Sequence, residues 1–458
     1  MEKAEFHESD LQKDPLPGSS KPPSVRIPAY NNDSSLSSST QPQSEAERSP
    51  ISTNPNPRVT IRSERSLRNT LPPSTRSSTL LGERPPPLTI LQCLKAIIFS
   101  TWLNVLLVFV PLGIVADQVG WSPIIVFIFN FIAIVPLAKL LGFATEEISL
   151  RLGENLGALL NASFGNAVEL ILSIIALKEG KIDVVQASLL GSVLSNLLLV
   201  LGCCFVAGGF KFSSQKFNQT AAQTSASLLS LSCLSLLIPA AFASTAKSTE
   251  QTSGIQHLSQ GSAIVLLIVY ILFLYFQLKT HTHLYSNSNE EEQEEPTLPL
   301  WLGVVMLLII TVIVAFCSEY LVGAIDPLAS SWNVSRTFIG LILLPIVGNA
   351  AEHVTAVSVA MKNKMDLAIG VAVGSSMQIA LFVTPLMVII GWIISEPMTL
   401  FFNTFETCVL FVTVLIVNYL IQDGESNWLE GVMLISTYII IAIAVFYYPV
   451  ADVVSGTA

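Results

Sequence analysis

Gly165-Asn166-Ala167-Val168-Glu169 returns later in the chain as Gly348-Asn349-Ala350-Ala351-Glu352, and each copy lies inside a long apolar run. The correspondence continues downstream at a constant offset of 183 residues. Apolar residues match easily by chance, whereas a polar set held in one register does not. The sequence therefore indicates an internal repeat. The further identical pairs are Lys181 with Lys364, Asp183 with Asp366, Gly191 with Gly374 and Ser192 with Ser375.

The composition is typical of a membrane protein. The chain has 458 residues, of which 51% are hydrophobic and 12% charged, and its mean hydropathy is +0.61. A soluble domain carries about 25% charged residues. The formal net charge of −10 gives no reason to expect a nucleic-acid partner, and the six cysteines form no CxxC pair. We therefore expect the lipid bilayer as the main surrounding, with neither a disulfide scaffold nor a zinc site.

Residues 1–95 differ from the rest of the chain and are predicted to form a disordered Ser- and Pro-rich tail. The first 88 residues hold 14 of the 25 prolines and show almost no apolar periodicity, so they cannot bury a core. A basic stretch from Arg58 to Arg84 is either simply solvated or a regulatory segment that is phosphorylated or rests on anionic lipid. Because Met1–Glu5 begins no apolar signal region, the first membrane helix is expected to direct targeting.

Long apolar runs begin near residue 100. A transmembrane helix needs about 20 apolar residues, and the runs predict an all-α polytopic membrane protein with 11 transmembrane helices. Glycines and prolines inside several runs, such as Gly165, Pro345 and Gly348, predict broken helices, which are tolerated only where they face protein or a water-filled cavity. The helices are predicted near 100–118, 121–147, 156–177, 184–208, 217–243, 259–279, 298–324, 335–361, 367–393, 402–421 and 428–448.

One leading helix and two inverted repeats account for these runs. The leading helix is placed at 96–118, the first repeat (helices two to six) at 119–280 and the second (helices seven to eleven) at 298–450. Each repeat has an odd number of helices, so the second must enter the membrane from the opposite side. Inverted repeats of this kind are typical of transporters that bind their substrate near the membrane midplane.

An acidic linker at 281–297 separates the two repeats. It is either a solvated connection or a regulatory element that binds or concentrates cations at the mouth of the protein. The Lys and Arg residues of short loops, together with the Arg-rich tail, favour the cytosol as the side that carries the tail and the linker. The acidic residues of the linker are Glu290, Glu291, Glu292, Glu294 and Glu295.

Glu169 and Glu352 are the strongest candidates for a functional site. Each lies inside an apolar run, where a carboxylate costs at least about 2.5 kcal/mol. The alternative, a glutamate near a helix end that reaches water, does not fit their distance from the ends of the runs. Polar residues from both repeats complete the predicted site: Asn166, Ser192 and Asn196 from the first, and Asn349, Ser375 and Gln378 from the second.

The predicted site offers oxygen ligands from carboxylates, amides and hydroxyls. Hard divalent cations prefer such ligands: Ca²⁺ takes roughly six to eight oxygens, and Mn²⁺ also accepts them. Two carboxylates neutralise one Ca²⁺. Without the cation they repel each other in a low-dielectric cavity and tend to take up protons. The site therefore predicts exchange of Ca²⁺ for H⁺, with both ions as transported substrates and no resident cofactor.

Residues 161–202 and 341–379, which contain the two motif copies, closely resemble the paired helix motifs of the CAX cation/proton exchangers. These belong to the cation/Ca²⁺ exchanger superfamily, and the resemblance is greatest to its fungal vacuolar Ca²⁺/H⁺ exchangers. It covers roughly residues 95–450. The resemblance implies eleven helices, the two motif glutamates as Ca²⁺ and H⁺ sites, and a vacuolar membrane in which a separate proton pump makes the gradient. It therefore implies an antiporter that sequesters cytosolic Ca²⁺ in the vacuole.

Three further residues are candidates for a proton or access path. Glu146 ends the second predicted helix, and Glu319 lies late in the seventh, at the corresponding place in the repeat. They are either interfacial helix-end glutamates or carboxylates that line the way to the site, as the family resemblance suggests for Glu146. His353 follows Glu352 and points about 100° away on a helix. It is either a satisfied interior histidine or a proton or gating partner.

Three other functions fit the sequence less well. A Ca²⁺/Na⁺ exchanger differs in its counter-ion, and relatives that use Na⁺ carry further acidic residues in the motif helices, which this chain lacks. A Ca²⁺-permeable channel usually builds its filter from several subunits, whereas this chain repeats internally. An intramembrane protease needs a pattern such as HExxH. Glu352-His353 has no such partner, so we do not expect an enzyme.

Overall fold

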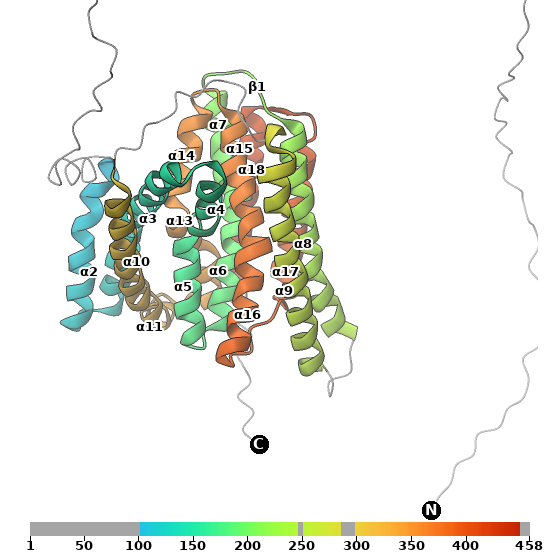
Figure 1. Ribbon diagram of the computed structural model, residues 1–458. Helices are drawn as coiled ribbons and strands as arrows, with labels where there is room; N and C mark the ends of the chain where they lie inside the picture. Colours follow the sequence, from blue (N-terminus) through green and yellow to red (C-terminus); the bar gives the residue numbers. More distant parts are fainter. Residues whose placement is uncertain (1–100, 246–250, 285–297, 449–458) are drawn as a thin grey trace, which may run out of the picture. The chain divides into compact units, whose positions relative to one another are not determined.

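The computed structural model describes residues 101–245, 251–284 and 298–448, all within one compact unit, Arg84–Ala458 (Figure 1). The described residues are almost entirely helical, with one two-stranded ribbon, so the all-α prediction is confirmed. The N-terminal tail and the acidic run 290–295 lie outside the described residues. The predictions made for those two segments stay predictions.

The first half of the described chain contains helices α2 to α9. It begins with a 3₁₀ helix, η1 (Trp102–Val108), and ends with a π-helical and a 3₁₀ segment, η3 (Phe276–Thr280) and η4 (Thr282–Leu284). The elements between them are α2 (Phe109–Gln118), α3 (Pro123–Leu152), α4 (Glu154–Phe164), α5 (Ala167–Lys178), α6 (Ile182–Leu194), the π-helical η2 (Ser195–Val200), α7 (Leu201–Gly209), β1 (Gln215–Lys216), α8 (Gln219–Thr245) and α9 (Gln251–Tyr275).

The second half contains helices α10 to α18. Two π-helical segments interrupt its helices, η5 (Ile339–Leu343) and η6 (Ile379–Val383). The remaining elements are α10 (Leu300–Gly323), α11 (Ile325–Trp332), α12 (Arg336–Phe338), α13 (Leu344–Gly348), α14 (Ala350–Ala360), α15 (Met365–Gln378), α16 (Thr384–Ile394), α17 (Thr404–Leu420), β2 (Glu425–Ser426) and α18 (Trp428–Tyr447).

Seven of the described helices are long and apolar enough to cross a membrane. A bent pair, Arg336–Gly348 and Ala350–Ala360, meets at 56° and makes an eighth span if its two parts are counted together. Trp102–Gln118 and Thr404–Leu420 are shorter apolar helices. The structure thus supports a polytopic helical membrane protein, and the count of eleven spans stays a prediction. The seven are Pro123–Leu152, Ile182–Gly209, Gln219–Ala243, Ser253–Thr280, Leu300–Trp332, Met365–Ile394 and Trp428–Tyr447.

Both copies of the motif interrupt a helix. Asn166 (φ −106°, ψ 29°) separates α4 from α5, and Asn349 (φ −89°, ψ 5°) separates α13 from α14. The breaks that the sequence indicates at Gly165 and Gly348 are therefore confirmed, whereas the prediction that each glutamate lies in the middle of a helix, near 156–177 and 335–361, is wrong. Glu169 and Glu352 instead lie in the first turn of a new helix. The positive end of the helix dipole favours a negative charge there.

Helix α6 connects the two halves of the molecule. It begins the candidate span Ile182–Gly209, which continues through η2 and α7 and whose apolar window is 83% buried, more than that of any other candidate span. It packs against α5 and also against η5 and α13 of the second half. At Gly191 a Cβ would collide with the Leu341 carbonyl oxygen and would lie 2.7 Å from Pro345 Cγ. Only a glycine allows this close approach between the halves.

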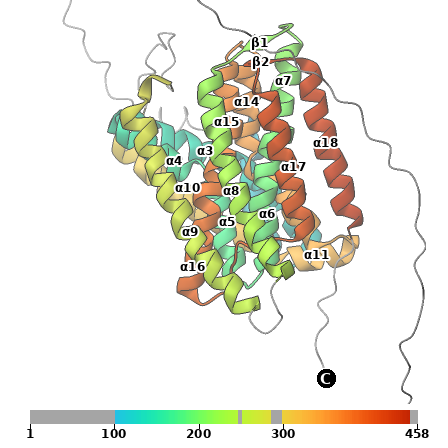
Figure 2. The same ribbon diagram turned by 90° about the vertical axis from the view of Figure 1, so that its right-hand side faces the viewer.

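The outer helices also pack one half of the chain against the other. Helix α3 packs along α10 with α2 beside them (Figure 1), while α8 packs against α17 and α7 against α18. Strands β1 and β2 pair antiparallel, with Gln215 opposite Ser426, and join the two halves at one end of the helices (Figure 2). Elements far apart in the sequence are therefore neighbours throughout, and this brings the two motif copies together.

Candidate ion-binding site

A cavity of about 330 Å³ brings the two predicted glutamates together, and we call it the glutamate cavity. Its wall is formed by α3, α4, α5, α14, α15 and the residues that border them. Glu169 lines it from α5 and is 8% exposed, and Glu352 lines it from α14 and is partly buried. Ser375 and Gln378 of α15 complete its polar wall. Residues of both repeats therefore face one space.

Ser375 is the centre of a hydrogen-bond network that crosses between the repeats. Its hydroxyl lies 3.0 Å from Asn166 Oδ1 and 3.3 Å from each carboxylate oxygen of Glu352. A hydroxyl has one proton, so it donates to only one of these acceptors at a time. Asn196 Nδ2 donates to the Ser375 hydroxyl (3.1 Å), and Asn166 Nδ2 donates to Gln378 Oε1 (2.7 Å). Both repeats therefore hold Glu352 in place.

Ser192 and Asn349 are buried beside the glutamate cavity and do not line it. Asn349 Nδ2 lies 3.4 Å from the Ser192 carbonyl oxygen, to which it donates. The Oδ1 atoms of Asn349 and Asn196 are buried and have no hydrogen-bond partner among the described residues. A buried acceptor oxygen is costly unless it is satisfied. Acceptor oxygens of this kind suit a cation and not an anion.

Gly348 provides the space for the Glu169 carboxylate. A Cβ at residue 348 would lie 2.7 Å from Glu169 Oε1, closer than such atoms approach in folded proteins. The glycine of one motif copy therefore fits against the glutamate of the other. The reverse contact is not made, because a Cβ at Gly165 would meet the Asn161 carbonyl oxygen instead. The two copies are equivalent in sequence but differ in their surroundings in this conformation.

The charges of the two motif glutamates match a single divalent cation. Among the residues that the structure describes, no group of three or more His, Cys, Asp and Glu side chains is placed to hold one metal ion. Glu169 and Glu352 together would balance a charge of about two. The remaining ligands would be amide, hydroxyl, backbone or water oxygens, which Ca²⁺ accepts readily. The donor set therefore fits the oxygen-only cation site predicted from the sequence.

The three residues predicted for an access path lie in different places. Glu146 lines the glutamate cavity, two turns after Lys139 on α3. Glu319 lies exposed near the end of α10 and is not part of that wall. His353 is partly buried and turns towards η2, where its Nε2 lies 3.4 Å from Ser195 Oγ. The position of Glu146 agrees with an access role, whereas the positions of Glu319 and His353 offer it no support.

Lys139 is a charged residue of the cavity wall that the sequence analysis missed. Its Nζ lies 3.4 Å from Thr355 Oγ1, and both residues line the glutamate cavity. The sequence does contain a signal, because Lys139 is the only charged residue of α3 before Glu146. A lone lysine inside an apolar run carries the same meaning as a lone glutamate.

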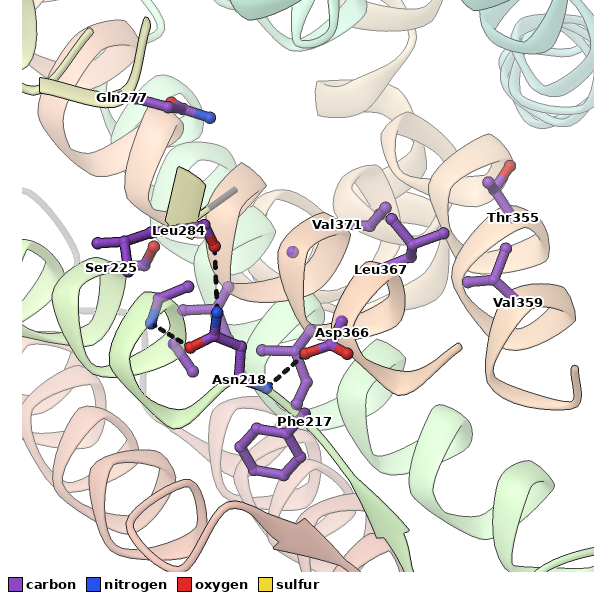
Figure 3. A pocket seen from close by; sticks show the side chains of 15 residues that line it. Phe217, Asn218, Ser225, Gln277, Leu284, Thr355, Val359, Asp366, Leu367 and Val371 are labelled. Atoms are coloured by element: carbon purple, nitrogen blue, oxygen red, sulfur yellow. Dashed lines mark hydrogen bonds between the residues drawn. The ribbon is translucent and has the colours of Figure 1, made fainter. Parts of the chain in front are cut away.

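A larger cavity of about 560 Å³ adjoins the glutamate cavity. Thr355, Gly370 and Val371 line both spaces. Figure 3 shows the polar side of this adjoining cavity, where the backbone N–H of Asn218 donates to an Asp366 carboxylate oxygen. Thr355, with Lys139 bound to it, therefore lies where the two cavities meet.

A third cavity also borders Glu169 and has a volume of only about 10 Å³, so we call it the closed cavity. The repeat offset of 183 residues relates its wall to that of the glutamate cavity. The closed cavity is therefore the counterpart of the open one under the internal repeat. In the closed wall Leu172, Ser188, Ser192, Leu344 and Gly348 take the places that Thr355, Val371, Ser375, Asn161 and Gly165 take in the open wall.

The chain resembles known transporters along most of its length. It is 53% identical over 367 residues to a vacuolar calcium ion transporter of Schizosaccharomyces pombe, a match that covers 79% of this chain and 89% of that protein. It is 48% identical over 361 residues to a Ca²⁺/H⁺ antiporter of Synechocystis sp., covering 75% of this chain and 97% of that protein. The resemblance to CAX-type exchangers predicted from the motifs is thereby confirmed.

Solved structures share the fold. The structure of native YfkE superposes with a TM-score of 0.65 at 38% identity and covers 75% of this chain and 99% of that one. The H⁺/Ca²⁺ exchanger CAX superposes with a TM-score of 0.55 at 14% identity, covers 75% and 91% of the two chains, and supports the fold alone. The family described as sodium/calcium exchanger protein matches residues 122–279 and 302–447, which hold one motif copy each. The chain belongs to the sodium/calcium exchanger protein family.

Proposed function

We propose that this protein is a Ca²⁺/H⁺ antiporter that sequesters cytosolic Ca²⁺ across the vacuolar membrane. The relatives named a vacuolar calcium ion transporter and a Ca²⁺/H⁺ antiporter support this substrate pair. The observation that carries the proposal is the joint placement of Glu169 and Glu352, one from each motif copy, at one cavity. The protein is thus a transporter that depends on a proton gradient made by a separate pump.

In this proposal the two carboxylates hold either Ca²⁺ or protons. Ca²⁺ binds between Glu169 and Glu352, with hydroxyl and amide oxygens of Ser375, Asn196 and Gln378 as neighbours. Protons replace the cation on the acidic side, because two ionised carboxylates facing one low-dielectric space repel each other. A site that holds neither ion is energetically costly. Ca²⁺ therefore leaves only as protons bind, and this couples the two fluxes. Mn²⁺ also accepts oxygen ligands and is proposed as a competing cargo.

Alternating access follows from the relation between the open and closed cavities. Glu169 borders both spaces, so it is reached from one side or the other according to which cavity is open. The walls correspond residue by residue under the internal repeat, as expected for two inverted repeats that exchange conformations. We therefore propose that the closed cavity expands while the glutamate cavity collapses in the other half of the cycle.

The proposed topology has eleven spans: a leading helix and two inverted repeats of five. It requires that α4–α5 and α12–α14 cross as broken helices and that the short α2 and α17 also cross. Arg151 Nε donates to the Leu298 carbonyl oxygen (2.6 Å), and Asn218 Nδ2 donates to the Leu284 carbonyl oxygen (3.1 Å). Both ends of the acidic linker therefore adjoin the same end of the bundle, the end at which η1 begins (Figure 1). We place this end in the cytosol, following the distribution of Lys and Arg.

A Ca²⁺/Na⁺ exchanger is the second candidate, because the family description includes sodium/calcium exchange. The number of acidic ligands disfavours it. Among the described residues the cavity wall contains three carboxylates, those of Glu169, Glu352 and Glu146, and the positive charge of Lys139 offsets one of them. A site that binds several Na⁺ ions in place of one Ca²⁺ needs more anionic and hydroxyl oxygens than this arrangement offers.

The test is Ca²⁺ uptake into sealed vesicles that contain the purified protein and have an acidic interior. We expect uptake to require the pH gradient, to stop when a protonophore is added, and to vanish in Glu169→Gln and in Glu352→Gln. Glu425→Gln is the matched control, because Glu425 lies in the ribbon outside the cavity. Uptake driven by a Na⁺ gradient instead would support the second candidate, and gradient-driven uptake that survives both substitutions would refute the proposed site.

A further inference from the structure

Lys139 lies in the membrane-embedded part of α3, where a charged side chain is energetically costly. It is 13 residues from the end of the helix at Leu152 and 16 from the start at Pro123, roughly 20 Å or more from either end. A lysine can place its ammonium in water from near a helix end, but not from this depth. Its head group must therefore be solvated from inside the protein, and the glutamate cavity provides that environment.

The surroundings of Lys139 are those of a charge that faces the ion path. It shares the cavity wall with Glu146, Glu169 and Glu352. Its Nζ contacts Thr355 Oγ1 (3.4 Å), one turn beyond Glu352 on α14. In the part of the chain that the structure describes it forms no ion pair within 4.0 Å. The ammonium therefore has a neutral partner, Thr355, in the wall that also holds the carboxylates, and it forms no fixed salt bridge.

The charge is present on one side of the internal repeat only. Upstream of the motif copies the repeat offset is 173 residues, because Phe143-Ala144-Thr145-Glu146 in α3 matches Phe316-Cys317-Ser318-Glu319 in α10. Lys139 therefore corresponds to Val312. Val312 is apolar and 54% exposed. The glutamate cavity thus has a positive charge that its counterpart cannot have in the opposite conformation. A merely structural role does not explain this asymmetry, because packing needs neither repeat to carry a charge here.

We propose that the Lys139 ammonium is a tethered cation of the transport site that competes with the entering divalent cation for Glu169 and Glu352 and lowers the apparent affinity from this side. The inference rests on the proposed function. When the site holds neither Ca²⁺ nor protons, the ammonium offsets part of the charge of the two carboxylates. When Ca²⁺ arrives, the ammonium, held by Thr355, repels the cation. Lys139 therefore sets the affinity and does not carry the ion.

The experiment compares the Ca²⁺ dependence of pH-gradient-driven uptake in vesicles for the unsubstituted protein, Lys139→Ala and Lys139→Arg. Removing the positive charge raises the local concentration of divalent cations at the carboxylates, so KM should fall about three- to tenfold in Lys139→Ala. Lys139→Arg should keep the KM of the unsubstituted protein. Lys279→Ala is the matched control, because Lys279 lies exposed in η3, outside the cavity.

A chemical variant separates charge from packing even where Lys139→Ala reduces the amount of folded protein. Lys139→Cys is treated with 2-aminoethyl methanethiosulfonate, which restores a positive charge, or with the negatively charged 2-sulfonatoethyl reagent. The unsubstituted protein receives the same reagents to correct for its own cysteines. The positive adduct should raise KM relative to unmodified Lys139→Cys, and the negative adduct should lower it.

Each outcome decides one question. A KM that follows the charge at residue 139 supports the tethered cation. A KM that is the same in the alanine variant and in both adducts, or a change in maximal rate alone, overturns it and leaves Lys139 a structural residue. Absence of gradient-driven uptake in the unsubstituted protein would instead overturn the proposed function, so the two failures are distinguishable.

Discussion

Replacing Gly191 by alanine tests the direct contact between the repeats at α6. The new Cβ would collide with the Leu341 carbonyl oxygen and would lie 2.7 Å from Pro345 Cγ. A backbone carbonyl inside a helical segment cannot rotate away as a side chain can, so α6 and η5 must separate. Overpacking costs about 1–3 kcal/mol, whereas glycine to alanine inside a helix gains about 0.5–1 kcal/mol. We expect a net loss of roughly 1–2 kcal/mol.

Gly374 offers a matched control, because it occupies the corresponding position in the second repeat. A Cβ there would meet no atom within 4 Å. Gly374→Ala therefore keeps the gain in helix propensity without the collision, and its stability should equal or exceed that of the unsubstituted protein. Effects common to both substitutions, such as reduced backbone freedom in the unfolded chain, cancel in the comparison.

Thermal unfolding of the purified protein in detergent, followed by size-exclusion chromatography of the heated samples, measures the difference. One kcal/mol shifts Tm by roughly 2–4 °C in a domain of 150–250 residues, and the shift is smaller in a larger chain. Gly191→Ala should have a Tm a few degrees below that of Gly374→Ala. Equal Tm values for the two variants would refute the close contact at α6.

Three further substitutions test other contacts. Gly348→Ala should displace the Glu169 carboxylate, because its Oε1 would lie 2.7 Å from the new Cβ. The KM for Ca²⁺ uptake should rise about tenfold with little change in Tm. An unchanged KM would contradict this contact. Glu147→Ala removes the acceptor of the buried Leu298 N–H (2.8 Å) and should lower the free energy of unfolding by about 1–3 kcal/mol. Tm should therefore fall, and it should fall less in Glu147→Gln, which keeps an acceptor oxygen. Asn427→Ala removes the capping box at the start of α18 and should cost about 1 kcal/mol; faster amide hydrogen exchange in the first turn of α18 checks this, and unchanged exchange would speak against it.

The sequence predicts most helices well because the bilayer fixes their length and polarity. The run predicted at 184–208 is helical from Ile182 to Gly209, and the one predicted at 428–448 is α18, Trp428–Tyr447. The meeting of Glu169 and Glu352 at one cavity is also predictable, since a carboxylate inside an apolar run is costly and is retained there for a function. Both predictions depend on local composition and on the repeat, which are visible in the chain itself.

The details that depend on tertiary contacts are not predictable in the same way. Gly165 and Gly348 indicate breaks in the sequence, but only the structure shows that a new helix begins after Asn166 and Asn349 with the glutamate in its first turn. Ser192 and Ser375 are equivalent in the repeat, yet only Ser375 lines the glutamate cavity. One sequence folds into both conformations of a transporter, whereas a structure shows only one of them. The repeat therefore cannot reveal which member of an equivalent pair faces the open side.

Two ion pairs join the repeats near the start of α6. Lys181 Nζ lies 3.4 Å from Asp326 Oδ2, and Arg336 Nη1 lies 3.9 Å from Asp183 Oδ2, so both pairs join the first repeat to the second. Most of these side chains are partly exposed, and pairs of this kind contribute only about 0–1 kcal/mol each. Pairs of this strength add little to the energy difference between the two conformations of the proposed cycle. In the proposed cycle the occupancy of Glu169 and Glu352 would then decide which side opens, because a ligand shifts such an equilibrium by its difference in affinity for the two states.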